Sequence, residues 1–129
     1  PSFNELRRDG IAATRYNMLN PTATPHLPFV TQVLQDRQGP VIVATDYIRN
    51  YADQIREYVP QQFVVLGTDG FGRSDTRKQL RKFFEVNSYY ITVAALQALA
   101  IEGKIAASIV AEAIAKYGID VNKAQPWTV

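Results

Sequence analysis

The residues of this chain best suited to chemistry form one glycine-rich segment, Gly67-Thr68-Asp69-Gly70-Phe71-Gly72-Arg73-Ser74. The segment follows an apolar run typical of a buried strand and precedes a predicted helix, which is where open α/β sheets place ligands. Its glycines permit a tight turn, a serine can cap the helix, and nearby arginines add positive charge at a positive helix end. This pattern indicates an anion-binding turn whose candidate residues are Asp69, Gly70, Phe71, Gly72, Arg73, Ser74 and Arg77.

The glycine spacing of this segment excludes two well-known phosphate loops. Its G-x-x-G-x-G order differs from the dinucleotide fingerprint G-x-G-x-x-G, and no Gly-Lys-Ser/Thr follows it as in a Walker loop. The alternative interpretation is a structural turn in which Asp69 and Arg73 make hydrogen bonds and ion pairs across an interface. With neither fingerprint present, the structural turn is the favoured interpretation.

A second charged feature is a basic cluster within ten residues, formed by Arg73, Arg77, Lys78, Arg81 and Lys82. The spacing of four between Arg77 and Arg81, and between Lys78 and Lys82, places these cations along one flank of a helix. A solvated helix face is the default interpretation, and docking to an acidic partner is the alternative. The net charge of +2 is too small to favour nucleic-acid binding.

The chain lacks the residues that most catalytic and metal sites need. His26 is its one histidine, it lies in a proline-flanked loop, and there is no cysteine. A Ser-His-Asp triad, a thiolate metal site and a cysteine nucleophile are therefore disfavoured or excluded. We assign no catalytic, cofactor-binding or metal-binding residue to this chain.

Length and composition are those of one folded domain. The chain has 129 residues, of which 47% are hydrophobic and 20% charged, a balance that excludes a disordered protein. The longest strongly apolar stretch, 91–101, is far shorter than the ~20 residues that span a bilayer. We expect no membrane partner and a cytoplasmic location.

The elements that position these residues follow from hydrophobic patterning. The β-branched run 41–44 and the apolar run 63–66 predict two strands buried on both faces, joined by a helix over about 47–59 as in a βαβ unit. Further helices are predicted over about 3–16, from Phe29 to near Gly39, over 74–84 and 87–102, and over 105–117. The fold class is therefore α/β, an open sheet with flanking helices.

Several features predict that this sheet is incomplete. Two strands make a poor parallel sheet, and the helix over 87–102 is apolar nearly all round, so it needs neighbours on several sides. Ser2 and Glu5 form a capping-box pattern at the very start of the chain. We expect a piece of something longer, or a second chain that covers these surfaces.

Motifs along nearly the whole chain, in order, resemble those of one family, the homodimeric bacterial type of the pyruvate dehydrogenase decarboxylating component. The motifs are Ser2-Phe3-Asn4-Glu5-Leu6, Arg8-Asp9-Gly10, Tyr16-Asn17-Met18-Leu19, Thr45-Asp46-Tyr47, Leu66-Gly67-Thr68-Asp69-Gly70-Phe71-Gly72-Arg73-Ser74-Asp75, Phe84-Glu85-Val86, Val93-Ala94-Ala95-Leu96 and Ala113-Ile114-Ala115-Lys116-Tyr117. The resemblance is to the end of the family's C-terminal domain and implies a transketolase-like C-terminal fold. Residues 1–129 would form most of that single domain.

The resemblance also implies what the parent enzyme does. It would decarboxylate pyruvate with thiamine diphosphate and magnesium, then pass the acetyl group to lipoyl groups of a dihydrolipoyl acetyltransferase in a multienzyme complex. This domain would support dimer and domain assembly and be inactive alone. The alternative function is a regulatory or docking module that binds an anionic metabolite or an acidic partner.

No residue role of the family can be carried over to this chain. The family's Gly-Asp-Gly metal motif is not matched, because Thr68 stands where its first glycine would be, and no paired asparagines occur. Lys82-Phe83 also stand where the family has histidines, which puts any role of that position in doubt.

Overall fold

The computed structural model describes residues 2–70 and 75–128. The helices are α1 (Phe3–Leu19), α2 (Phe29–Leu34), α3 (Arg49–Asp53), α4 (Arg77–Phe83), α5 (Ser88–Ile101) and α6 (Ala107–Lys116). The strands are β1 (Val41–Ala44) and β2 (Phe63–Leu66), and short 3₁₀ turns span η1 (Arg56–Tyr58) and η2 (Pro126–Thr128). Within these residues no helix has both the length and the apolar character needed to cross a membrane.

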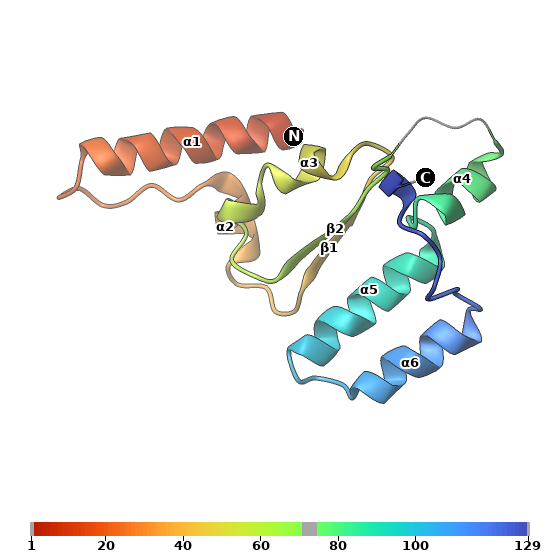
Figure 1. Cartoon of the computed structure of the whole chain (residues 1–129). Coiled ribbons are helices and arrows are strands. Elements are labelled where there is room, and N and C mark those ends of the chain that lie inside the picture. The colour runs from red at the N-terminus through yellow and green to blue at the C-terminus, as the bar shows by residue number, and fades with distance from the viewer. Residues whose placement is uncertain (1, 71–74, 129) are drawn as a thin grey trace.

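The two strands pair in parallel, with Val41 opposite Phe63 and Ala44 opposite Leu66. Both strands have the bounds that their apolar runs predict, and the chain between them crosses over through α3 and η1. Figure 1 shows the pair in the middle of the molecule, between an N-terminal group of helices, α1 to α3, and a C-terminal group, α4 to α6. The α/β fold class predicted from the sequence is confirmed.

The core lies on the side of the sheet that faces the N-terminal helices. Phe63 and Val65 alternate inward along β2, because successive strand residues point to opposite faces. The remaining members of this cluster come from α2, α3 and the turn after it. They are Val30, Ala52, Ile55, Tyr58 and Val59.

Helix α1 begins and packs as its sequence predicts. The hydroxyl of Ser2 accepts a hydrogen bond from the Glu5 amide at 3.1 Å, which satisfies one of the free amides of the first turn. Farther along, Gly10 is buried against the ring of Tyr58, where an added Cβ would lie 2.7 Å from Cδ2 and closer still to two other ring atoms. The absence of a side chain at position 10 therefore sets the distance between α1 and the core.

Three local expectations differ from the structure. The helix predicted over about 47–59 begins only at Arg49, because the hydroxyl of Thr45 accepts from the Tyr47 amide and closes a turn before it; Tyr47 is 65% exposed. That helix also ends early, at Asp53, and the chain continues as the 3₁₀ turn η1. The cap of α4 is Thr76, whose hydroxyl accepts from the Gln79 amide at 3.3 Å.

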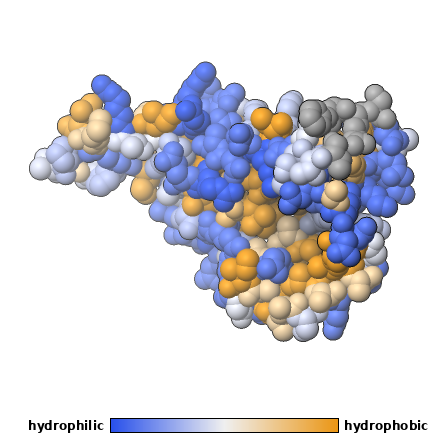
Figure 2. Space-filling model, in the orientation of Figure 1, coloured by the Kyte–Doolittle hydropathy of each residue, from blue (hydrophilic) through white to orange (hydrophobic). Residues whose placement is uncertain are grey.

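Helix α5 is less covered than its composition predicts. It contacts both strands and α6, but Ala98 is its one fully buried residue. Figure 2 shows apolar surface over the part of the molecule that Figure 1 assigns to α5 and α6. The exposed large apolar residues of this C-terminal half are Tyr89, Ile101, Ile109, Val121 and Trp127.

The accessible surface is also large for a chain of this mass. It measures 8720 Å² for 14.5 kDa, whereas a compact monomer of that mass exposes about 6900 Å². The excess is larger than the roughly 800 Å² that one partner buries in a specific protein–protein interface. Surface that a compact domain would bury is therefore open in this chain.

The contact between Gly10 and Tyr58 gives a stability prediction. We expect Gly10→Ala to lower the free energy of unfolding by about 1 to 2 kcal/mol, because the clash with a buried ring outweighs the better helix propensity of alanine. Urea denaturation measures the change. In a Tyr58→Leu background the same substitution should become neutral or stabilising, and an equal loss in both backgrounds would contradict the steric explanation.

Candidate functional site

Part of the predicted anion-binding turn lies in the described structure. Asp69 and Gly70 follow β2, and Arg77 is the first residue of α4. The other four candidates, Phe71, Gly72, Arg73 and Ser74, lie outside the described residues. The turn can therefore be judged by the contacts of Asp69, Gly70 and Arg77.

The carboxylate of Asp69 is directed at the start of α3. Its Oδ1 accepts a hydrogen bond from the Arg49 amide at 2.9 Å, and its Oδ2 lies 3.7 Å from Nε of the same residue. A negative charge there satisfies a free amide and complements the positive end of the helix. Asp69 thus serves as a cap supplied from another part of the chain.

Gly70 marks a close approach between the turn and the C-terminal tail. Its φ is +133°, and an added Cβ would lie 2.8 Å from the carbonyl oxygen of Pro126. Pro126 is buried, and the neighbouring Trp127 ring lies 5.3 Å from the guanidinium carbon of Arg49. The tail is therefore packed against the same corner that Asp69 organises.

Thr68 ties together the loops that follow the two strands. Its hydroxyl donates to the carbonyl of Asp46 at 2.6 Å, and its amide donates to the carbonyl of Tyr47 at 2.9 Å. Together with the Asp69 contact, these bonds point the polar groups of residues 68 and 69 into the protein's own backbone. Residues 68 and 69 therefore make structural contacts, and both the anion-binding turn and the interface role of Arg73 stay predictions.

Arg77 belongs to a different site from Asp69. It lines an open cavity of about 1130 Å³ at the carboxyl end of β1, and neither Asp69 nor Gly70 lines it. The cavity lies between α4, the first turn of α5 and the chain after α6. Its cationic residues are Arg77, Lys78, Arg81, Lys82 and Lys123.

The cations of α4 are unevenly paired. Arg81 Nη2 lies 3.7 Å from a carboxylate oxygen of Asp46, and both side chains are largely exposed. Within the described residues, Arg77, Lys78 and Lys82 have no carboxylate within 4.0 Å of their charged nitrogens. The predicted basic flank is therefore present, and it forms one wall of the cavity.

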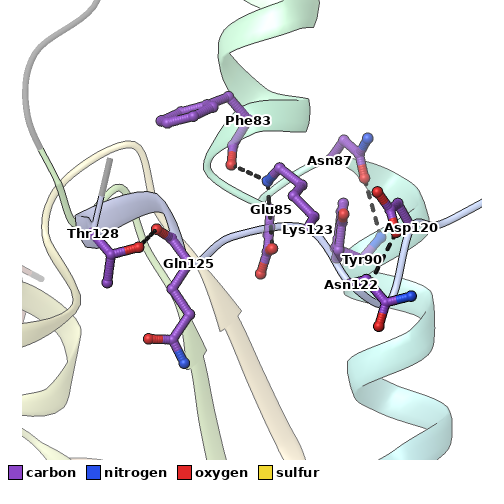
Figure 3. A network of polar contacts seen from close by, with 9 residues as sticks. All are labelled: Phe83, Glu85, Asn87, Tyr90, Asp120, Asn122, Lys123, Gln125 and Thr128. Atoms are coloured by element: carbon purple, nitrogen blue, oxygen red, sulfur yellow. Dashed lines mark hydrogen bonds and ion pairs between the residues drawn. The ribbon is translucent and has the colours of Figure 1, made fainter.

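A polar network joins the tail to the corner between α4 and α5 (Figure 3). Lys123 Nζ donates to the carbonyl of Phe83 at 2.6 Å and lies 3.4 Å from Oε1 of Glu85. Glu85 has a φ of +63°, a left-handed conformation unusual for a residue with a side chain. Lys123 thus holds this turn in place from about forty positions away in the sequence.

Sequence reasoning missed this network. In the sequence, Glu85 belongs to the motif Phe84-Glu85-Val86 of the family resemblance, and no motif includes Lys123. No short-range pattern could have predicted a contact between residues 38 and 40 positions apart. The only local sign in the sequence is a charged residue, Glu85, directly after the predicted helix over 74–84.

Aromatic residues also line the cavity. The Tyr89 and Tyr117 rings stack with centroids 4.8 Å apart and planes 20° apart, and Tyr89 is 50% exposed. Tyr89 therefore lies partly at the surface. Burial raises the pKa of Tyr90 above its ordinary value, and the nearby carboxylates of Glu85 and Asp120 raise it further.

The single histidine lies far from this cavity in a second hollow beside α1. Its ring stacks on Tyr16 with centroids 3.5 Å apart, and its backbone amide and carbonyl both bond the side chain of Asn17. Among the described residues, no three His, Asp or Glu side chains are grouped so that they could hold a metal ion.

The chain is similar in sequence to known proteins. Residues 1–87 match the family of the transketolase-like TK C-terminal domain. The chain is 57% identical over its full length to a protein named "Pyruvate dehydrogenase E1 component" from Cupriavidus necator. Proteins of the same name from Pseudomonas aeruginosa and Escherichia coli K12 are 58% and 51% identical over 98% and 97% of the chain.

These similarities confirm the resemblance inferred from the motifs. The chain spans about 14% of the length of the curated relatives it matches.

The contacts of Asp69 give a prediction that separates a structural role from a binding role. We expect Asp69→Ala to lower the free energy of unfolding by about 1 to 2 kcal/mol, because the Arg49 amide loses its acceptor at a helix end. Asp69→Asn, which keeps an acceptor oxygen, should lose less. Chemical denaturation of the three proteins tests this, and unchanged stability in both variants would contradict the capping role.

Proposed function

Because this chain belongs to the family of transketolase-like C-terminal domains, we propose that it serves a pyruvate dehydrogenase decarboxylating enzyme as an assembly domain. Residues 1–129 would form most of one domain of that enzyme, which acts in the cytoplasm. Its surfaces would join the catalytic domains and the second subunit of a homodimer. The acetyl group would reach a dihydrolipoyl acetyltransferase through the full enzyme, not through this domain.

The observation that carries the proposal is the incompletely covered α5. A helix whose residues are almost all apolar is stable in water only where neighbours cover it. Here Ile101 is 66% exposed, and Ile109 on the adjoining α6 is 43% exposed. An apolar surface of this kind indicates contact with further protein.

The sheet supports the same role. In the described structure it has two strands, so each strand has a neighbour on one side only. Parallel sheets are found almost always with both faces covered and with more than two strands. A domain that completes its sheet and its helix packing within a larger enzyme accounts for both features.

The residues described here do not fit the cofactor of the proposed parent enzyme. Thiamine diphosphate is bound through a magnesium ion, and the described residues contain no group of carboxylates or histidines placed to hold one. The one aspartate in a Thr-Asp-Gly context, Asp69, uses both carboxylate oxygens at Arg49. The cofactor and the reacting groups would therefore belong to other parts of the enzyme.

The first prediction from this proposal concerns the chain alone. With pyruvate, thiamine diphosphate and magnesium it should release no carbon dioxide above background. Magnesium should not raise its affinity for thiamine diphosphate, measured by calorimetry with and without the metal. Turnover, or an affinity that depends on magnesium, would refute a purely assembling role.

The second test examines assembly directly. This chain would replace the matching segment of the Cupriavidus necator relative, with which it is 57% identical. We expect a chimaera that decarboxylates pyruvate and sediments as a dimer. Ile101→Glu with Ile109→Glu should reduce both properties, because charge at an interface core is costly to bury.

A matched control is Thr22→Glu with Thr24→Glu, which adds the same charge in an exposed loop away from α5 and α6. This control should leave dimer and activity unchanged. If the isoleucine variant also behaves like the unaltered chimaera, the uncovered face of α5 and α6 is not the assembly surface.

A further inference from the structure

The cavity beside α4 has an excess of positive charge that the proposed assembly role does not explain. Arg77 and Arg81 lie four residues apart on one helix, as do Lys78 and Lys82, and like charges at this spacing destabilise a helix. Of these four cations, only Arg81 has a carboxylate nearby in the described structure, that of Asp46. The cavity also adjoins the carboxyl end of β1, the end of a parallel strand at which α/β proteins bind ligands.

The remaining charges of the cavity do not cancel this excess. Lys123 is paired with Glu85 at 3.4 Å, and Asp120 is the second carboxylate of the lining beside Asp46. The lining therefore has five cations against two carboxylates, and Figure 3 shows Lys123 and Asp120 at the corner beyond the end of α4. Positive potential is left along Arg77, Lys78 and Lys82.

The cavity lining also includes an aromatic surface. Tyr89 is half exposed and rests on Tyr117, so one ring face is supported by protein while part of the ring remains accessible. Aromatic rings stack favourably with centroids about 4.5 to 7 Å apart. A cavity with cations on one wall and a supported ring on the other suits a ligand that has both an anionic end and a planar end.

We propose that this cavity binds a phosphorylated compound with a planar aromatic ring, of the nucleotide class. Its phosphates lie against Arg77, Lys78 and Lys82, and its ring lies against Tyr89. The volume of about 1130 Å³ is sufficient for a ligand of that size. The proposal uses neither Ile101 nor Ile109, the residues on which the assembly role is tested, so the two proposals can fail separately.

Calorimetry with three probes tests whether the site has one part that binds phosphate and another that binds the aromatic ring. Adenosine triphosphate, pyrophosphate and adenosine are titrated into the chain without magnesium at low salt, where charge attraction is strongest. The triphosphate should bind more tightly than either half-ligand. Its affinity should fall as salt is raised, whereas that of adenosine should change little.

Paired variants assign the two walls. Arg77→Gln with Lys78→Gln should weaken both the triphosphate and pyrophosphate about tenfold, which corresponds to one charge-assisted hydrogen bond. Tyr89→Leu should weaken the triphosphate and leave pyrophosphate unchanged. These side chains are exposed, so the variants should keep the thermal unfolding curve of the parent chain.

The matched control is Arg37→Gln with Lys104→Gln, which removes the same charge from exposed positions that do not line the cavity. It should bind as the unaltered chain does. Three results would each overturn the proposal: no triphosphate binding, equal weakening by the control, or insensitivity of the triphosphate to Tyr89→Leu. Binding of polyglutamate that depends on Arg77 and Lys78, without triphosphate binding, would assign the wall to an acidic polypeptide.

Discussion

The structure depends on one constraint, that two short parallel strands must be covered on both faces. A parallel pair buries its side chains on either side, and the β-branched residues of β1 and β2 leave neither face suited to water. On one face, Phe63 and Val65 pack against α2, α3 and the turn that contains Tyr58. Helix α5 lies against the strands from the C-terminal half, and α6 packs on it.

The same constraint fixes where polar groups gather. Loops that leave parallel strands do so at one edge, and there the chain satisfies its own backbone through Thr68 and Asp69. Because these side chains are committed to Asp46 and Arg49, residues 68 and 69 link the loops that follow the two strands. Charge that is free to meet a ligand lies one element later, on α4, where Arg77 and Lys78 face open space.

The elements that sequence predicts well are those set by local chemistry. Continuous apolar runs predict the bounds of both strands, and Ser2 and Asn87 cap α1 and α5 as side chains of their type should. Predictions failed where a distant residue decides. Arg49 starts α3 under the influence of Asp69, twenty positions away, and Glu85 is held by Lys123. The apolar composition of α5 predicts that it needs neighbours, but a local pattern does not predict which surfaces cover it, because such contacts join residues far apart in the sequence.

Helix α5 connects the two proposals physically. Its first turn, with Tyr89, forms a wall of the cavity, and its far end, with Ile101, forms the uncovered apolar face. A helix of this length moves as a rigid element, so a displacement of its first turn also displaces its last turn. If a ligand at Tyr89 favours one position of α5 and a neighbouring subunit favours the same position, each must strengthen the binding of the other by an equal factor. There is no such coupling if the ligand and the subunit each bind equally well to every position of α5, however tightly each binds.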